Sequence, residues 1–122
     1  MALAGVLAMQ TPIVVLDEPT TGQDAGGVAM VAGVVEALAS AGRTVIAITH
    51  DMDFAAEHFD RVVVMAKGEV LADGAPATVF GEADALARAA VEPPQLFRLA
   101  AHLGWPDRPL TVEGFVDAFE RR

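Results

Sequence analysis

The chain has 122 residues, of which 53% are hydrophobic, so it can form one core of modest size. It carries 8 basic and 17 acidic residues, and its formal net charge of −9 argues against nucleic acid as the main partner, because neutralising phosphates needs a basic face. There is no cysteine, which excludes disulfides, thiolate chemistry and a cysteine-based zinc site.

The first predicted strand is the aliphatic run at residues 13–16, which is too short for a helix and does not alternate with polar residues. This pattern predicts a strand buried on both faces, at the centre of a parallel sheet. Asp17, Glu18 and Pro19 follow it directly, at the strand end where open α/β sheets bind ligands. Such a pair of carboxylates suits a Mg²⁺ ion, which prefers oxygen ligands, or a base that activates water.

Two other interpretations of these carboxylates stay open. The acidic pair can be a solvated turn with no ligand. Alternatively, Asp17 can be the phosphoacceptor of a receiver-like domain. That reading also needs a second acidic pair and a lysine at a strand end. Lys67 is the only lysine and precedes a glycine in a hairpin turn, so it is a poor candidate.

A helix is predicted over residues 25–39, with Asp24 as its N-cap and Gly42 at its end. A second buried strand follows at residues 44–49 and leads directly to His50. The strand, helix and second strand form a parallel unit, so His50 is expected at the same sheet edge as Asp17 and Glu18. A single histidine after a strand is more often a turn residue, but this position favours a functional role.

The rest of the chain predicts a hairpin and several helices. Strands at 61–66 and 69–73 flank the turn Lys67-Gly68. His58 and His102 are interpreted as surface residues. The first residues, 1–9, are interpreted as the last turns of a buried helix. The remaining predicted helices are 52–59, 76–80, 82–91, 95–103 and 111–120, the last with Thr111 as N-cap and an apolar face of Val112, Phe115, Val116 and Phe119.

Several segments together resemble one protein family. Residues 13–19 resemble the Walker B segment of an ATP-binding cassette (ABC) transporter ATPase, residues 21–24 resemble its D-loop, and residues 49–51 resemble its H-loop. The continuation at 59–68 and 74–80 is also similar to this family. The tail, with Pro93-Pro94 and the segment 110–115, is similar to the extension of energy-coupling-factor ATPases, which serve cobalt, nickel or vitamin uptake.

The resemblance implies a role for each matching residue. Asp17 would orient Mg²⁺ and Glu18 would be the general base. His50 would contact the γ-phosphate of ATP, and Asp24 would bind the cofactor across an ATP-sandwiched dimer. Gln23 departs from the family pattern, which has an aliphatic residue at that position.

The resemblance also implies an architecture and a setting. The expected fold is α/β, a partial P-loop NTPase (RecA-like) parallel sheet with flanking helices and a β-hairpin, followed by a small helical extension. Residues 1–91 would belong to the nucleotide-binding domain and 92–122 to the extension. The protein would be cytoplasmic and peripheral to the inner membrane. Its partners would be transmembrane subunits and a second ATPase subunit.

The pattern G-x-x-x-x-G-K-[ST], which cradles phosphates, does not occur in the sequence, and neither does the family's signature segment. The chain is therefore expected to be the carboxyl-terminal half of a cassette, inactive in isolation and binding MgATP weakly or not at all. The alternative is a non-hydrolysing remnant or split-cassette module that acts by dimerising or by complementing an amino-terminal half. DNA-repair ATPases share the Walker B pattern, but the hairpin favours the transporter.

Overall fold

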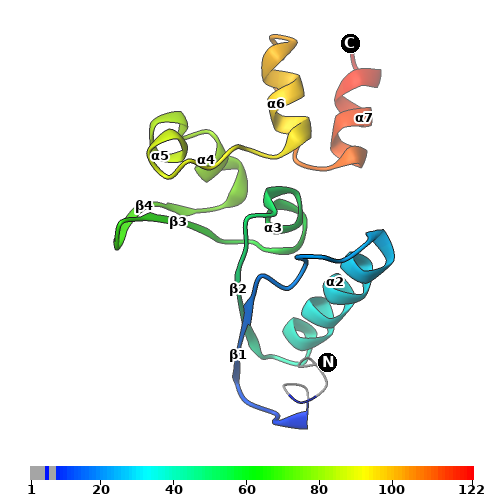
Figure 1. Cartoon of the computed structure of the whole chain (residues 1–122). Coiled ribbons are helices and arrows are strands. Elements are labelled where there is room, and N and C mark those ends of the chain that lie inside the picture. The colour runs from blue at the N-terminus through cyan, green and yellow to red at the C-terminus, as the bar shows by residue number, and fades with distance from the viewer. Residues whose placement is uncertain (1–4, 6–7) are drawn as a thin grey trace. The chain divides into compact units, whose positions relative to one another are not determined.

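The computed structural model describes residues 5 and 8–122 (Figure 1). The helix end predicted for residues 1–9 lies largely outside the described residues. The chain divides into two compact units, Met1–His50 and Asp51–Arg122, and each is described here by itself. Among the described residues, no helix is both long and apolar enough to cross a membrane.

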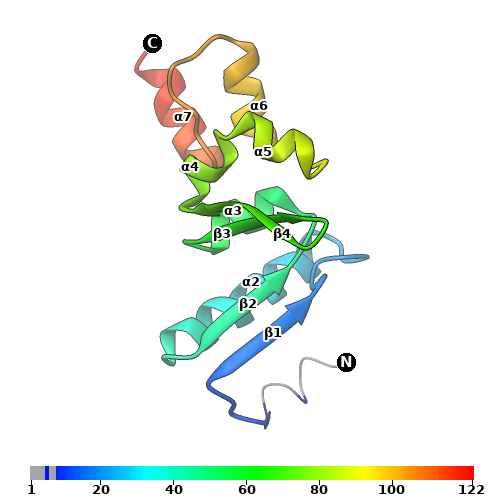
Figure 2. The ribbon, with the colours of Figure 1, turned by 90° about the vertical axis from the view of Figure 1, so that its left-hand side faces the viewer.

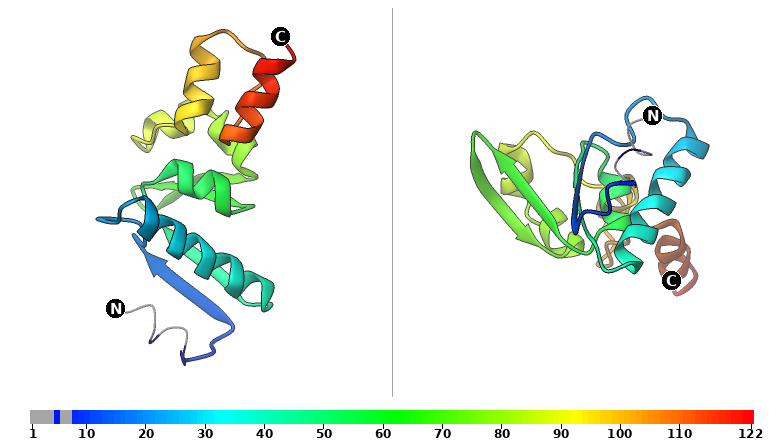
Figure 3. Two further views of the ribbon diagram at one scale, coloured as in Figure 1. Left: turned by 90° about the vertical axis from the view of Figure 1, so that its right-hand side faces the viewer. Right: turned by 90° about the horizontal axis from the view of Figure 1, so that it is seen from below.

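The first unit is a strand, a helix and a parallel strand, as the sequence predicts. Strand β1 (Ile13–Asp17) pairs with β2 (Thr44–Ile48), in a register that runs from Ile13 opposite Thr44 to Asp17 opposite Ile48. Helix α2 (Ala25–Ser40) connects the two strands and lies along one face of the pair (Figures 2 and 3). This arrangement sends the carboxyl ends of both strands to the same edge.

Burial along β1 alternates, which differs from the expected burial on both faces. Val14 and Leu16 are 2% and 7% exposed, whereas Ile13 and Val15 are both 56% exposed. Successive side chains of a strand point to opposite faces, and only one face lies against α2, whose Val31, Val35 and Leu38 are buried. The other face is exposed and apolar, and we call it the open face; it consists of Ile13, Val15, Ile46 and Ile48.

Local interactions explain where α2 begins and ends. The Asp24 carboxylate accepts a hydrogen bond of 2.8 Å from the Gly27 N–H, so Asp24 is the N-cap, as predicted. The helix ends at Ser40, and Gly42 follows with a φ of +81°, a left-handed conformation that glycine adopts without strain. Arg43 then donates from Nε to the Thr11 carbonyl at 2.6 Å, which ties the start of β2 to the residues before β1.

The second unit begins with α3 (Met52–His58) and an antiparallel hairpin. Strands β3 (Val62–Ala66) and β4 (Glu69–Gly74) pair around Lys67 and Gly68, with a register shift between Val64 and Met65. Lys67 and Gly68 have φ values of +51° and +78°, the left-handed pair that a tight hairpin turn requires. The hairpin predicted from the sequence is confirmed.

Short helices pack against this hairpin. Helix α4 (Pro76–Phe80) buries Val79 and Phe80 almost completely, and α5 (Ala83–Arg88) adds Leu86. Phe97 of α6 (Gln95–His102) joins the same core cluster as Phe80 and Leu86. The apolar contacts of the second unit therefore include residues on both sides of position 91. The predicted domain boundary at 91/92 stays a prediction.

The last helix, α7 (Val112–Glu120), lies beside α6 (Figure 3). Thr111 caps it by accepting from the Gly114 N–H, as predicted. Its predicted apolar face is mainly exposed: the exposed fractions are 72% for Val112, 46% for Val116 and 63% for Phe119.

Trp105 makes the main aromatic contacts with α7. Its ring stacks on Phe115 with centroids 4.9 Å apart, and Phe119 lies at 6.4 Å. The Arg122 guanidinium lies over the same ring, 4.3 Å from its centroid, and pairs with Asp107 at 3.1 Å. These contacts hold the end of α7 against the loop that follows α6.

Candidate active site

The parallel register brings Glu18 and His50 together, although they lie 32 residues apart in the chain. Asp17 is opposite Ile48, and the Glu18 N–H donates to the Ile48 carbonyl at 2.7 Å, which extends the pairing by one residue beyond β1. His50 follows β2 by two positions. The prediction that Glu18 and His50 share a sheet edge is therefore confirmed.

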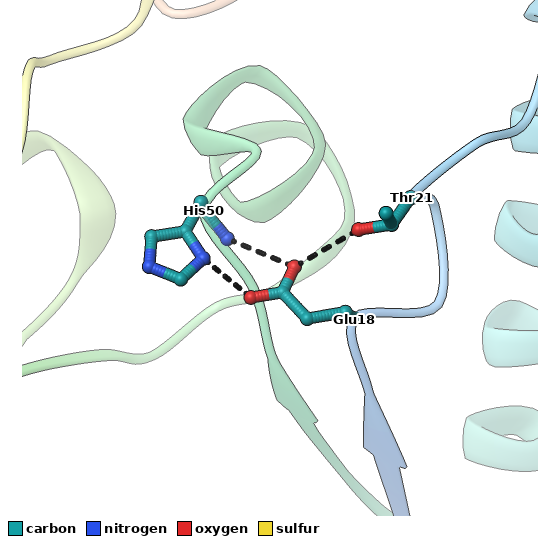
Figure 4. Close-up of polar contacts among 3 residues, drawn as sticks. All are labelled: Glu18, Thr21 and His50. Atoms are coloured by element: carbon teal, nitrogen blue, oxygen red, sulfur yellow. Dashed lines mark hydrogen bonds and ion pairs between the residues drawn. The ribbon is translucent and has the colours of Figure 1, made fainter.

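Both carboxylate oxygens of Glu18 have partners (Figure 4). Oε1 pairs with the His50 Nδ1 atom. Oε2 accepts from the His50 backbone N–H at 3.4 Å and from the Thr21 hydroxyl at 3.3 Å. Glu18 is thus held between the end of β2 on one side and the turn after β1 on the other.

Glu18 also has an unusual backbone. Its φ is +48°, in the left-handed region that residues other than glycine, asparagine and aspartate rarely adopt. The Thr21 N–H donates to the Glu18 carbonyl at 3.2 Å, and the Glu18 N–H is bonded to β2, so the surrounding hydrogen bonds fix this conformation. Strained backbone of this kind concentrates at functional sites.

The electrostatics favour an ionised carboxylate. Partial burial acts to raise the pKa of Glu18, but the hydrogen bonds and positive charge of His50, together with the Thr21 hydroxyl, outweigh it and lower the pKa below its usual value. The Glu18 side chain is 30% exposed and the His50 side chain 89% exposed. The ionised carboxylate can take a proton from water. The accessible imidazole next to it can contact an anionic ligand.

The two other predicted site residues are placed differently. Asp17 is exposed at the end of β1, and its carboxylate has no hydrogen-bond or ion-pair partner in the part of the chain that the structure describes. The Asp24 carboxylate caps α2 and so has a local structural role. Of the four predicted site residues, Glu18 and His50 are the two that are in direct contact.

Comparison with known proteins identifies relatives, although no protein-family model matches the chain. The energy-coupling factor transporter ATP-binding protein EcfA of Methanocaldococcus jannaschii is 35% identical over 122 residues, which is 100% of this chain and 44% of EcfA. The cobalt import ATP-binding protein CbiO of Rhodobacter capsulatus is 39% identical over 100 residues, which is 82% of this chain and 36% of CbiO. This chain is a homologue of part of an ABC transporter ATP-binding protein.

The fold of this chain agrees with its sequence relationship to ABC transporter ATP-binding proteins. The structure of CbiO1 from Clostridium perfringens, described as part of the ABC transporter complex CbiONQ, covers 84% of this chain with a TM-score of 0.60 and 35% identity. The match takes up 40% of the CbiO1 chain, and the chain spans between 17% and 44% of the length of the relatives in sequence. The partial P-loop NTPase fold expected from the sequence is confirmed.

In the described part of this chain, Mg²⁺ would have to be held by a single carboxylate and not by a cluster of acidic side chains. No group of three or more His, Asp or Glu side chains suited to a metal occurs within residues 5 and 8–122. Mg²⁺ keeps several waters and is often held by one or two carboxylates together with substrate phosphates. The single accessible carboxylate of Asp17 fits this kind of site, in which the nucleotide supplies further ligands.

Two contacts of the turn after β1 were not predicted. The hydrogen bond from Thr21 to Glu18 depends on the left-handed φ of Glu18, which the sequence does not signal. Gln23, the departure from the family pattern, lays its side chain over Gly27, where any Cβ atom would clash with it. The glycine at the start of α2 therefore makes room for the glutamine.

Proposed function

We propose that this chain supplies the water-activating part of the ATP site of an ABC-type importer ATPase. The observation that carries the proposal is the contact between the Glu18 carboxylate and His50 at the carboxyl edge of the parallel strands. The relatives EcfA and CbiO are named as energy-coupling factor and cobalt import proteins, so uptake of cobalt, nickel or a vitamin is the proposed setting.

In this proposal, each residue has one task. Glu18, which is ionised at neutral pH, accepts a proton from the attacking water. His50 has an exposed ring that contacts the γ-phosphate while its backbone N–H orients Glu18. Asp17 would hold Mg²⁺, which when bound neutralises charge on the phosphates. Asp24 would reach the cofactor from the start of α2.

The phosphate-binding part would come from further polypeptide. The relatives are more than twice as long as their match to this chain, and phosphate cradling in such ATPases uses a glycine-rich loop with a lysine. We therefore propose that hydrolysis needs a complementing amino-terminal segment and a second ATPase subunit. Transmembrane subunits would hold the assembly at the cytoplasmic side of the inner membrane.

The test is MgATP hydrolysis by the chain alone and after mixing with a polypeptide that carries the phosphate-binding loop. Hydrolysis is expected only in the mixture. Glu18→Gln should lower it by ~10²–10⁴-fold, because a general base contributes about that much. Glu69→Gln makes the same chemical change on β4, in the second unit, and should leave the rate within about twofold of the parent.

Two results would contradict the proposal. Full activity in Glu18→Gln would show that another group activates water. An absence of hydrolysis in every mixture would favour the alternative, a non-hydrolysing module that acts by binding another chain. The exposed apolar residues of the open face are the observation that favours this second function.

A further inference from the structure

We propose that Thr21 is a positioning residue for Glu18: its hydroxyl holds the plane of the Glu18 carboxylate so that one oxygen is directed at the imidazole of His50. The inference rests on the proposed role of Glu18 as the base and gives Thr21, within the D-loop-like segment, a role that neither the sequence pattern nor the comparisons assign. Thr21 touches neither water nor nucleotide in this scheme, and it acts through the orientation of Glu18 alone.

The argument begins with the different partners of the two oxygens (Figure 4). Oε2 accepts from the Thr21 hydroxyl at 3.3 Å and from the His50 N–H at 3.4 Å, whereas Oε1 contacts the imidazole. A carboxylate can rotate about its terminal bond, since that torsion has only broad preferences. Two donors on Oε2 oppose this rotation and so keep the carboxylate plane in the orientation that directs the other oxygen at the imidazole.

Without the hydroxyl, the hold on Oε2 weakens. Both hydrogen bonds to Oε2 are longer than the usual ranges, which are about 2.5–3.0 Å for O–H···O and about 2.7–3.2 Å for N–H···O bonds, so the oxygen is held by the two together. Without the hydroxyl, only the backbone amide at 3.4 Å would remain. The carboxylate would then sample orientations in which neither oxygen is correctly placed for the proton. Catalysis by a positioned group depends on its orientation, so a loosely held carboxylate should lower the rate of the chemical step.

The backbone of the turn does not depend on the Thr21 side chain. The Thr21 N–H donates to the Glu18 carbonyl and the Gln23 N–H donates to the Thr20 carbonyl, both at 3.2 Å. Thr20 is the buried threonine of this turn, whereas Thr21 is exposed. Changing the Thr21 side chain should therefore alter the contact with Glu18 and leave the fold intact.

The experiment compares Thr21→Val, which keeps the shape of threonine without its hydroxyl, with Thr21→Ser, which keeps the hydroxyl. In the mixture that hydrolyses MgATP, the valine variant should lose about tenfold in kcat, equal to about 1.4 kcal/mol of barrier, with KM within about twofold of the parent. The serine variant should retain a kcat within about twofold. Thr44→Val, at the exposed start of β2, is the matched control and should change neither constant.

The kinetic outcomes separate this inference from the proposed function. If Glu18→Gln abolishes hydrolysis but Thr21→Val has the parent kcat, the positioning role is wrong and the base assignment stands. A serine variant as slow as the valine variant would indicate a steric role and overturn the inference. If Glu18→Gln keeps full activity, the proposed function itself fails.

A second measurement needs no hydrolysis and uses the 122-residue chain. Nitrogen chemical shifts of the His50 ring report which nitrogen carries the proton. The parent and Thr21→Ser should favour protonated Nδ1, which donates to the held Oε1, and Thr21→Val should shift the population towards protonated Nε2. Identical tautomer populations in the parent and the valine variant would overturn the inference.

Discussion

Glu18 shows how one residue can depend on its surroundings for its chemistry. Its backbone is left-handed and both its oxygens are hydrogen-bonded. Partial burial acts to raise its pKa, but the contacts with His50 and Thr21 together outweigh this and lower the pKa. None of these properties belongs to a glutamate in isolation. The site is therefore made by the meeting of β1, β2 and the turn between β1 and α2.

Asp73 provides a pH-dependent test of a second, purely structural pair. Both oxygens of Asp73 accept from the Arg61 guanidinium at 2.8 Å, and this contact lowers the pKa of Asp73. A carboxyl group with a folded-state pKa below its unfolded value adds stability above the unfolded value, near 3.9, and loses it as the pH falls through the folded value. We expect Asp73→Asn to lower the unfolding midpoint slightly at pH 7 and to equal the parent in strong acid.

Thermal unfolding of the parent and Asp73→Asn between pH 7 and pH 2 measures this. The pair is exposed, so the difference at pH 7 should be small and should shrink with added salt. Asp107→Asn, which removes the carboxylate that pairs with Arg122, is a control at another exposed ion pair. A difference between parent and Asp73→Asn that grows as the pH falls would contradict the expected sign.

At the scale of single residues, the sequence predicts the position of a side chain where a general rule of sheet architecture applies. Glu18 and His50 follow neighbouring strands, so the rule for sheet edges was enough to bring them together. The hydrogen bond from Thr21 to Glu18 was missed because Glu18 has a left-handed backbone, which a glutamate in a sequence does not predict. His58 was wrongly assigned to the surface: its side chain is 15% exposed, and its ring lies 5.2 Å from that of Phe54, a contact within one helical turn.

Among the elements, the paired strands of the first unit depend on a connection outside the ladder. Arg43 donates to the Thr11 carbonyl at 2.6 Å and to the Thr11 hydroxyl at 3.3 Å. We expect Arg43→Ala to destabilise the first unit by about 1.5 kcal/mol, because part-buried hydrogen bonds from a charged donor are lost. Urea unfolding followed by circular dichroism measures this loss.

A lysine at the same position provides the control. Arg43→Lys keeps the positive charge but cannot present the forked donor geometry of a guanidinium. It should recover only part of the stability lost in Arg43→Ala. Full recovery would show that charge alone, and not the bidentate contact with Thr11, accounts for the effect.

The elements were predicted well where their signals are local. The hairpin turn at Lys67-Gly68 and the caps Asp24 and Thr111 each depend on a few neighbouring residues, and all three are confirmed. The burial of the strand at residues 13–16 on both faces was wrong, because burial depends on which elements cover a strand. Covering elements are not encoded in the strand itself.

The whole molecule presents apolar surface in its first unit. The residues of the open face are 49% to 56% exposed, and within the described residues β1 and β2 each pair with one other strand only. Exposed apolar faces and unpaired strand edges both promote association with other chains. We expect the isolated chain to self-associate despite its net charge of −9.

Sedimentation velocity over a range of concentrations tests this expectation. Ile46→Thr keeps a β-branched side chain on the open face but makes it polar, so it should shift the distribution towards monomer. Val63→Thr, on the exposed side of the hairpin strand β3, makes a similar change elsewhere and should leave the distribution as in the parent. A single monomeric species at every concentration would contradict the prediction.

The packing of Trp105 gives the chain a built-in optical label. It is the only tryptophan, there is no tyrosine, and it lies in the second unit, in contact with the Phe115 ring of α7 and with the guanidinium of Arg122. Its emission therefore follows the second unit alone, whereas the circular dichroism of the helices follows both units. Comparing the two signals during denaturation asks whether residues 1–50 and 51–122 unfold together or one after the other, with no dye attached and no residue replaced.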